Sequence, residues 1–179
     1  MRESKNSWTV YGYISVAILA YSWSTYLQKS QKLNSLVYAA GFSIIEFIFT
    51  SFHSADKDGK MKMNFPHINL ANGHTTWPQF WCNTATLWLF IDYYMQSIPS
   101  PIIRLVLFPI NIWLLEVIEG YFLIFLYGRN VAWTYEGSDA FFSGNVKLSY
   151  WKYWLMLSGC LEIGYPTIQF VLEQVQKIQ

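Results

Sequence analysis

The chain has 179 residues, of which 53% are hydrophobic and only 13% are charged. Soluble domains carry about 25% charged residues, so this composition argues against an ordinary soluble domain and is typical of a membrane protein. The net charge of +1 and the lack of a long basic run argue against a nucleic-acid partner.

Five apolar segments are long enough to cross a hydrocarbon core of about 30 Å at roughly 1.5 Å rise per residue. We predict membrane-spanning helices at residues 8–27, 35–52, 77–97, 102–127 and 150–171. A polar turn is expected at 28–34, and Pro109 is expected to kink the fourth segment or mark a late helix start. Residues 1–179 are therefore expected to form a single all-α domain, a polytopic membrane helical bundle.

Two longer polar or aromatic loops, 53–76 and 128–149, connect these segments. With five spans, eight of the 12 Lys and Arg residues fall on the side of the bundle that holds the N-terminus. Positive charge favours the cytoplasmic side, so the N-terminus is expected to face the cytoplasm or an organelle's matrix. The first segment is interpreted as a retained helix rather than as a cleaved signal peptide.

Acidic side chains lie inside four of the five apolar segments. They are Glu46, Asp92, Glu116, Glu119 and Glu162. An ionisable group at bilayer depth costs roughly 2.5–3.5 kcal/mol, so such groups normally turn inward and find a partner. We therefore expect these five acids to face a polar interior within the bundle.

Glu116 and Glu119 are three residues apart, which places both on one helix face. Gly120 follows them, and a small residue lets another backbone approach closely. Two carboxylates this close in a low dielectric do not both ionise unless a cation sits between them. Two interpretations stay open: a proton or cation site, or a protonated or Arg-paired contact between helices.

Glu162 lies four residues before Pro166, which cannot donate to the Glu162 carbonyl. A carboxylate and a freed carbonyl thus share one helix turn, either as a cation or amine site or simply where the helix bends. Arg104 and Arg129 are the available counter-charges, although both can also extend to lipid headgroups.

The sequence lacks the signatures of the common catalytic and metal sites. None of the three His residues has the helical spacing of a metal motif, and no nucleophile elbow or phosphate-binding loop occurs. We therefore expect no catalytic residue, no metal site and no cofactor.

The second loop is unusually aromatic for a connection exposed to water. Its candidate lid or docking residues are Trp133, Tyr135, Phe142, Gly144 and Tyr150. Trp and Tyr rings favour the membrane–water interface. We expect this loop to fold back onto the mouth of the bundle, as a lid over the polar interior or as a docking surface for a partner subunit.

Several motifs follow one another in a fixed order: Trp113-x-x-Glu116-x-x-x-Gly120, Trp133-x-Tyr135, Phe142-x-Gly144, Leu148-x-Tyr150, Trp154 and Glu162. Together with Gly41-Phe42, Glu46-Phe47 and Phe49-Thr50, this pattern resembles the transmembrane protein 229 family. That family is grouped with bacterial membrane proteins labelled putative ABC-transporter type IV.

The resemblance covers roughly residues 35–165 and departs from the family at Thr134, where relatives tend to carry an acid, and in a longer first loop. It implies a multi-pass helical membrane fold and leaves the function open.

Three functions are compatible with the sequence. The favoured one is a non-enzymatic accessory subunit of a larger membrane complex, with membrane lipids and other membrane subunits as partners, because apolar surface marks interaction sites. The second is a transport component whose buried carboxylates bind a proton, a cation or an amine. The third is a lipid-modifying enzyme that uses paired carboxylates for acid–base chemistry.

Overall fold

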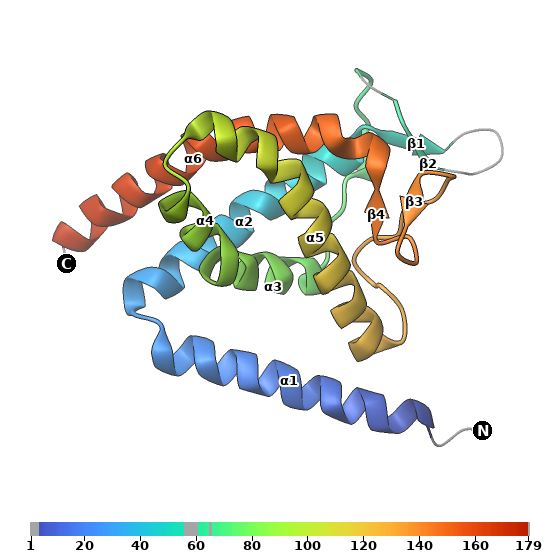
Figure 1. Cartoon of the computed structure of the whole chain (residues 1–179), viewed down its shortest axis with the longest axis horizontal. Helices are drawn as coiled ribbons and strands as arrows, with labels where there is room; N and C mark the ends of the chain where they lie inside the picture. The colour runs from blue at the N-terminus through green and yellow to red at the C-terminus, as the bar shows by residue number, and fades with distance from the viewer. Residues whose placement is uncertain (1–3, 56–60, 65, 179) are drawn as a thin grey trace.

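The computed structural model describes residues 4–55, 61–64 and 66–178, and its architecture is all-α (Figure 1). It contains five helical segments. They are α1 (Ser4–Tyr26), α2 (Lys29–Ser51), the composite helix α3 (Trp77–Thr86), η2 (Leu87–Ile91) and α4 (Asp92–Ser97), α5 (Pro101–Tyr127) and α6 (Trp151–Ile178).

Three helices within the described residues are long and apolar enough to cross a membrane. They are Lys29–Ser51, Pro101–Tyr127 and Leu148–Val175. Helix α1 is not among them, because its many Tyr, Ser and Trp side chains lower its mean hydropathy. The structure thus supports a helical architecture with several possible membrane spans, three of which meet the length and hydropathy expected of a span.

The predicted polar turn at 28–34 is wrong, because α2 already begins at Lys29. Gln28 caps this helix: its backbone N–H donates to Oε1 of Gln31 at 3.0 Å, and its carbonyl accepts from the Lys32 N–H at 3.0 Å. These bonds satisfy groups that a helix start otherwise leaves unpaired. Helix α6 likewise continues to Ile178, beyond the predicted end at residue 171.

Neither internal proline ends its helix. Helix α5 begins at Pro101, one residue before the predicted start, and runs through Pro109. Ser100 caps it by accepting from the Ile103 N–H, and Gly128 ends it with a φ of 77°. Helix α6 continues through Pro166 in the same way. A membrane helix tolerates an internal proline because groups on neighbouring helices can satisfy the backbone carbonyl that the proline leaves unpaired.

The core lies where four of the helical segments meet. Its buried members are Tyr38 of α2, Leu87 and Ile91 of η2, Tyr94 of α4, Phe108 of α5 and Leu161 of α6. Helix α1 runs along the edge of this body, and its main contact is with α5, where Gly12 lies against Leu126 (Figure 1).

Both long loops contain a short antiparallel hairpin. In the first, β1 (His53–Ala55) pairs with β2 (Met61–Met63), and η1 (Leu70–Asn72) follows. In the second, β3 (Ala140–Phe141) pairs with β4 (Val146–Lys147), and η3 (Leu148–Tyr150) leads into α6. The two loops meet, since Nε2 of His53 lies 3.1 Å from the Tyr150 hydroxyl.

Candidate functional site

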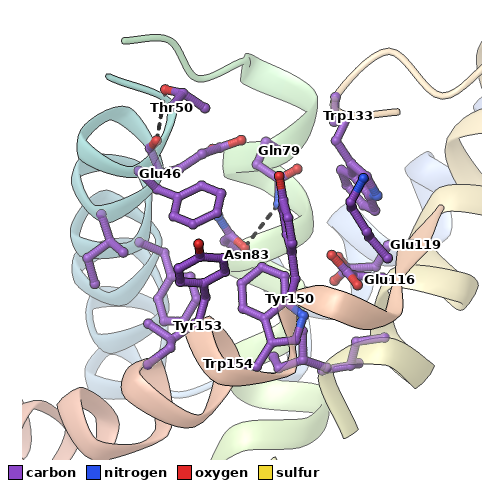
Figure 2. Close-up of a pocket in the computed structure, with 18 of the residues that line it drawn as sticks. Glu46, Thr50, Gln79, Asn83, Glu116, Glu119, Trp133, Tyr150, Tyr153 and Trp154 are labelled. Carbon is purple, nitrogen blue, oxygen red and sulfur yellow. Dashed lines mark hydrogen bonds between the residues drawn. The ribbon is translucent and has the colours of Figure 1, made fainter. Parts of the chain in front are cut away.

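A cavity of about 530 Å³ opens where the two loops meet the helices (Figure 2). Its walls come from α2, α3, α5, the start of α6 and the loop that follows α5. This volume is typical of small-molecule binding sites.

Three of the five intramembrane acids predicted from the sequence line this cavity. Glu46 stands on the α2 wall, and Glu116 and Glu119 stand on the α5 wall across from it (Figure 2). Each carboxylate accepts a hydrogen bond from a neutral hydroxyl. Thr75 donates to Glu46 at 2.5 Å, Tyr135 donates to Glu116 at 2.7 Å, and Thr86 donates to Glu119.

The cavity carries more acid than base. Among the described residues that line it, Lys147 is the one Lys or Arg, against four carboxylates. Its ammonium group is engaged elsewhere: it donates to the Glu136 carbonyl at 2.6 Å and lies 3.5 Å from Oδ1 of Asp139. His74 lies close enough to Glu46 to act on it electrostatically, whereas Glu116 and Glu119 depend on a proton or an external cation for charge balance.

Three buried polar atoms on lining residues have no hydrogen-bond partner within the described chain. They are Oε2 of Glu116, Oε1 of Gln79 and Nε1 of Trp154. Only 8% of the Glu116 surface is exposed. Burying a polar atom without a partner costs free energy, so each orphan indicates a group that a bound molecule can satisfy.

Aromatic rings from α2, η3 and the start of α6 form another part of the cavity wall. The Phe49 ring lies 5.7 Å from Tyr150, 5.4 Å from Tyr153 and 6.3 Å from Trp154, measured between centroids. Tyr135 joins the cluster at 5.2 Å from Tyr150. The faces of such rings attract cations. The cavity therefore combines carboxylates on two facing walls with a cluster of aromatic rings beside them.

The second loop reaches the cavity through its first aromatic residues. Nε1 of Trp133 donates to the Asn145 carbonyl at 2.9 Å, and the Tyr135 N–H donates to the Gly144 carbonyl at 2.8 Å. Asn145 is fully buried against Gly120, where an added Cβ would collide with the Asn145 side chain. A residue without a side chain thus allows the loop to approach α5.

The five loop residues predicted as a lid or docking surface divide into two groups. Trp133, Tyr135 and Tyr150 line the cavity. Phe142 lies outside its lining, is 56% exposed and has a φ of 54°, and Gly144 follows in the same tight turn with a φ of 79°. Phe142 and Gly144 therefore shape the turn rather than contact the cavity.

Two titratable groups of the loops are shifted by this environment. Burial raises the pKa of Tyr135 well above its ordinary value, and the adjacent Glu116 carboxylate raises it further. Tyr135 is therefore a hydrogen-bond donor at neutral pH. Burial lowers the pKa of His53, which also lines the cavity, so its imidazole favours the neutral form.

The other two predicted acids, Glu162 and Asp92, lie outside the cavity lining. Glu162 forms a bidentate ion pair with Arg104, at 2.7 Å to Nε and 2.5 Å to Nη2. Nη1 of Arg104 donates to the Ile98 carbonyl, and Tyr165 donates to Asp92 at 2.8 Å. Both acids therefore have hydrogen-bond partners within the protein. The partner of Glu162 is Arg104, one of the two counter-charges expected from the sequence.

The sequence reasoning missed three polar residues of the cavity, Gln79, Asn83 and Thr86. They stand four and three residues apart on α3 and so share one helix face. A polar stripe at this spacing inside an apolar segment was the signal that could have found them. The described residues contain no group of three or more His, Cys, Asp and Glu that could hold a metal ion.

No protein-family model, curated protein or solved structure matches this chain. The resemblance to the transmembrane protein 229 family therefore stays an expectation from the order of its motifs. Several of the residues that carry it, Glu46, Glu116, Trp133, Tyr135, Tyr150 and Trp154, line the same cavity.

Proposed function

We propose that this chain is a membrane transport component, without enzymatic activity, whose cavity binds a cationic ligand. The observation that carries the proposal is the set Glu46, Glu116 and Glu119, which line one cavity with hydroxyl donors but no Lys or Arg partner among the described residues. Intramembrane acids without a protein cation mark ion and proton pathways.

The proposal includes five membrane spans, namely the three long apolar helices together with α1 and the composite helix 77–97. With alternating directions, both long loops and the mouth of the cavity lie on the side that holds the N-terminus. This is the side with most Lys and Arg residues, so the cavity opens toward the cytoplasm or matrix. Ligand entry then depends on the aromatic loop that borders the cavity.

Carboxylates that lack a fixed counter-charge can exchange a proton for a cation. A protonated carboxyl group is the stable form in an empty low-dielectric site, whereas an ionised one is the stable form beside a bound cation. Ligand binding then releases a proton. This linkage provides a way to couple movement of the ligand to movement of protons in the opposite direction.

The test is proton movement in liposomes that contain the full chain and a trapped pH-sensitive dye. Adding protonated organic amines outside is expected to change the internal pH in wild-type liposomes. Glu116→Gln should abolish the response, whereas Glu173→Gln, at an exposed acid of α6 outside the cavity lining, should retain it. An unchanged response in Glu116→Gln, or no response to any cation, would overturn the proposal.

Helix α1 favours the accessory-subunit function as a second candidate. It exposes several large side chains, including Tyr11, Tyr13, Ile18 and Tyr21, and packs on the body mainly along α5, with a further hydrogen bond from Trp23 to Ser35 of α2. Tyrosine hydroxyls at bilayer depth need polar partners, which a neighbouring subunit can supply. Native mass spectrometry after gentle extraction from the source membrane tests this: stoichiometric release with other subunits supports it, and release alone contradicts it.

A further inference from the structure

We infer that the ligand of this cavity is an ammonium ion that carries N–H groups on an apolar body, and not a quaternary ammonium or a bare inorganic cation. The inference rests on the proposed cation-binding function and names the chemical class of that cation. Two features of the site carry it: the hydrogen-bond character of its orphan atoms, and the size and nature of its walls.

Two of the three orphan atoms of the cavity require donors, and the third, Nε1 of Trp154, is itself a donor. Oε2 of Glu116 and Oε1 of Gln79 are both acceptors, and both are buried without a partner in the described chain. An R–NH₃⁺ group offers three N–H donors, which matches the acceptor character of both atoms. A trimethylammonium group carries the same charge but offers no N–H, so both acceptors would stay unsatisfied beside it.

An inorganic cation fits these groups less well. Hard divalent cations require six or more oxygen ligands, or octahedral geometry with retained water. The described residues contain no suitable cluster of His, Cys, Asp and Glu. One oxygen of each carboxylate is already held by Thr75, Tyr135 or Thr86. The free oxygens of the cavity are therefore better suited to accept hydrogen bonds from one N–H donor group than to coordinate a metal ion.

The walls require an apolar body on the ligand. The cavity, at about 530 Å³, is far larger than an ammonium group alone, and the rings of Phe49, Tyr150, Tyr153 and Trp154 are part of its lining. A small hydrophilic ion in the cavity would leave this aromatic surface exposed to water. An aryl or alkyl chain on the amine buries that surface, and this burial adds a hydrophobic contribution to binding.

Three ligands that share one phenylbutyl chain test the inference: 4-phenylbutylamine, its N,N,N-trimethyl analogue and the neutral 4-phenylbutanol. Equilibrium binding is measured on the full chain in lipid nanodiscs, with empty nanodiscs as the blank. The primary amine should bind about tenfold or more tightly than the trimethyl analogue, because the latter cannot donate a hydrogen bond to a buried acceptor. The alcohol should bind most weakly.

A variant shows whether the discrimination comes from the orphan acceptors. Gln79→Met keeps the length of the side chain but removes the acceptor. It should reduce the preference for the primary over the trimethyl amine several-fold while retaining binding of the trimethyl analogue, which a misfolded protein would not do. Glu173→Gln, outside the cavity lining, should keep the full preference. An unchanged preference in Gln79→Met would contradict the assigned role of this acceptor.

The outcomes separate the two proposals. Equal affinity for the primary and trimethyl amines would overturn the N–H inference and leave a cation site in place. Absence of binding by both amines would overturn the proposed function itself.

The same chemistry is found in free amines and in lipids with a primary amine, and a chain-length series distinguishes these sources. Affinity that peaks at a short aryl or alkyl chain indicates a water-soluble amine. Affinity that rises through dodecylamine to octadecylamine, added in vesicles, indicates an amino lipid.

Discussion

The hydroxyl of Tyr135 lies 2.7 Å from Oε1 of Glu116, so a loop residue and a helix residue 19 positions apart hold each other in place. This bond orients one carboxylate oxygen and leaves the other, Oε2, buried and without a partner in the described chain. It also connects the aromatic loop to the acids of α5. The position of the loop and the state of the site are therefore coupled.

Tyr135→Phe is expected to destabilise the protein by about 1–3 kcal/mol, because it leaves a buried carboxylate oxygen without its donor. The measurement is thermal unfolding of the purified protein in detergent. The matched control is Tyr93→Phe, which removes a hydroxyl from a side chain that is 73% exposed. Equal melting temperatures for the two variants would contradict the stabilising role of the Tyr135–Glu116 bond.

Gly120 and Gly41 form a matched pair of helical glycines. A Cβ at Gly120 would collide with the side chain of Asn145, whereas a Cβ at Gly41 meets nothing within 4 Å. Gly120→Ala should therefore cost about 1–3 kcal/mol by overpacking. Gly41→Ala should be neutral or gain up to about 1 kcal/mol from helix propensity. Thermal unfolding checks both values, and a stable Gly120→Ala protein would show that the loop does not pack against α5.

Arg104 and Glu162 form a buried ion pair, so removing one partner should cost more than removing both. Arg104→Met or Glu162→Met alone is expected to destabilise by about 3–5 kcal/mol, because each leaves an unpaired charge. The double variant should recover much of this loss. A double-mutant cycle on thermal or denaturant unfolding measures the coupling, and strictly additive effects would argue against a direct pair.

His53 gives a pH dependence whose sign follows from its shift. Burial lowers its pKa below the ordinary value of about 6.5, and the charges of His74 and Lys147 act in the same direction. The folded state thus favours the neutral imidazole, and this contribution to stability is complete above pH 6.5 and is lost as the pH falls below it.

Wild type should therefore lose more stability between pH 7 and pH 5 than His53→Gln does. Melting temperatures measured across this range provide the comparison. His67→Gln, at an exposed histidine, should behave like the wild type. A His53→Gln protein with the wild-type pH profile would contradict the assignment.

The two free cysteines report whether α6 faces lipid. Cys160 is exposed on α6 and Cys82 is buried in α3. If α6 spans the bilayer, a lipophilic maleimide should label Cys160 in intact membranes, whereas a charged, membrane-impermeant maleimide should not. Cys160→Ser should abolish the labelling and Cys82→Ser should keep it. Labelling of Cys160 by the impermeant reagent would place that part of α6 in water.

The sequence by itself determined where most of the helices lie. Apolar runs, caps and loop residues are local signals, and the composite helix at 77–97 has the predicted bounds. The error at residues 28–34 also has a local cause. Lys29 and Lys32 suggested a turn, but a capping hydrogen bond to Gln31 lets the helix start at Lys29. The polarity of these residues therefore predicted a turn, whereas the capping hydrogen bond determined where α2 begins.

The sequence could name the five acids but not group them, because their grouping depends on how each helix is rotated and packed. Glu162 meets Arg104, which is 58 residues away in sequence, and Asp92 meets Tyr165, which is 73 residues away. These pairings leave Glu46, Glu116 and Glu119 to line the cavity.

The tertiary structure also decided which part of the aromatic loop belongs to the cavity. Gly120 on α5 provides the space that buried Asn145 fills, and this packing brings the start of the loop over the acids. Such a contact joins segments far apart in the chain, so no local pattern encodes it. Helix positions follow from local sequence, whereas the composition of the site follows from long-range packing.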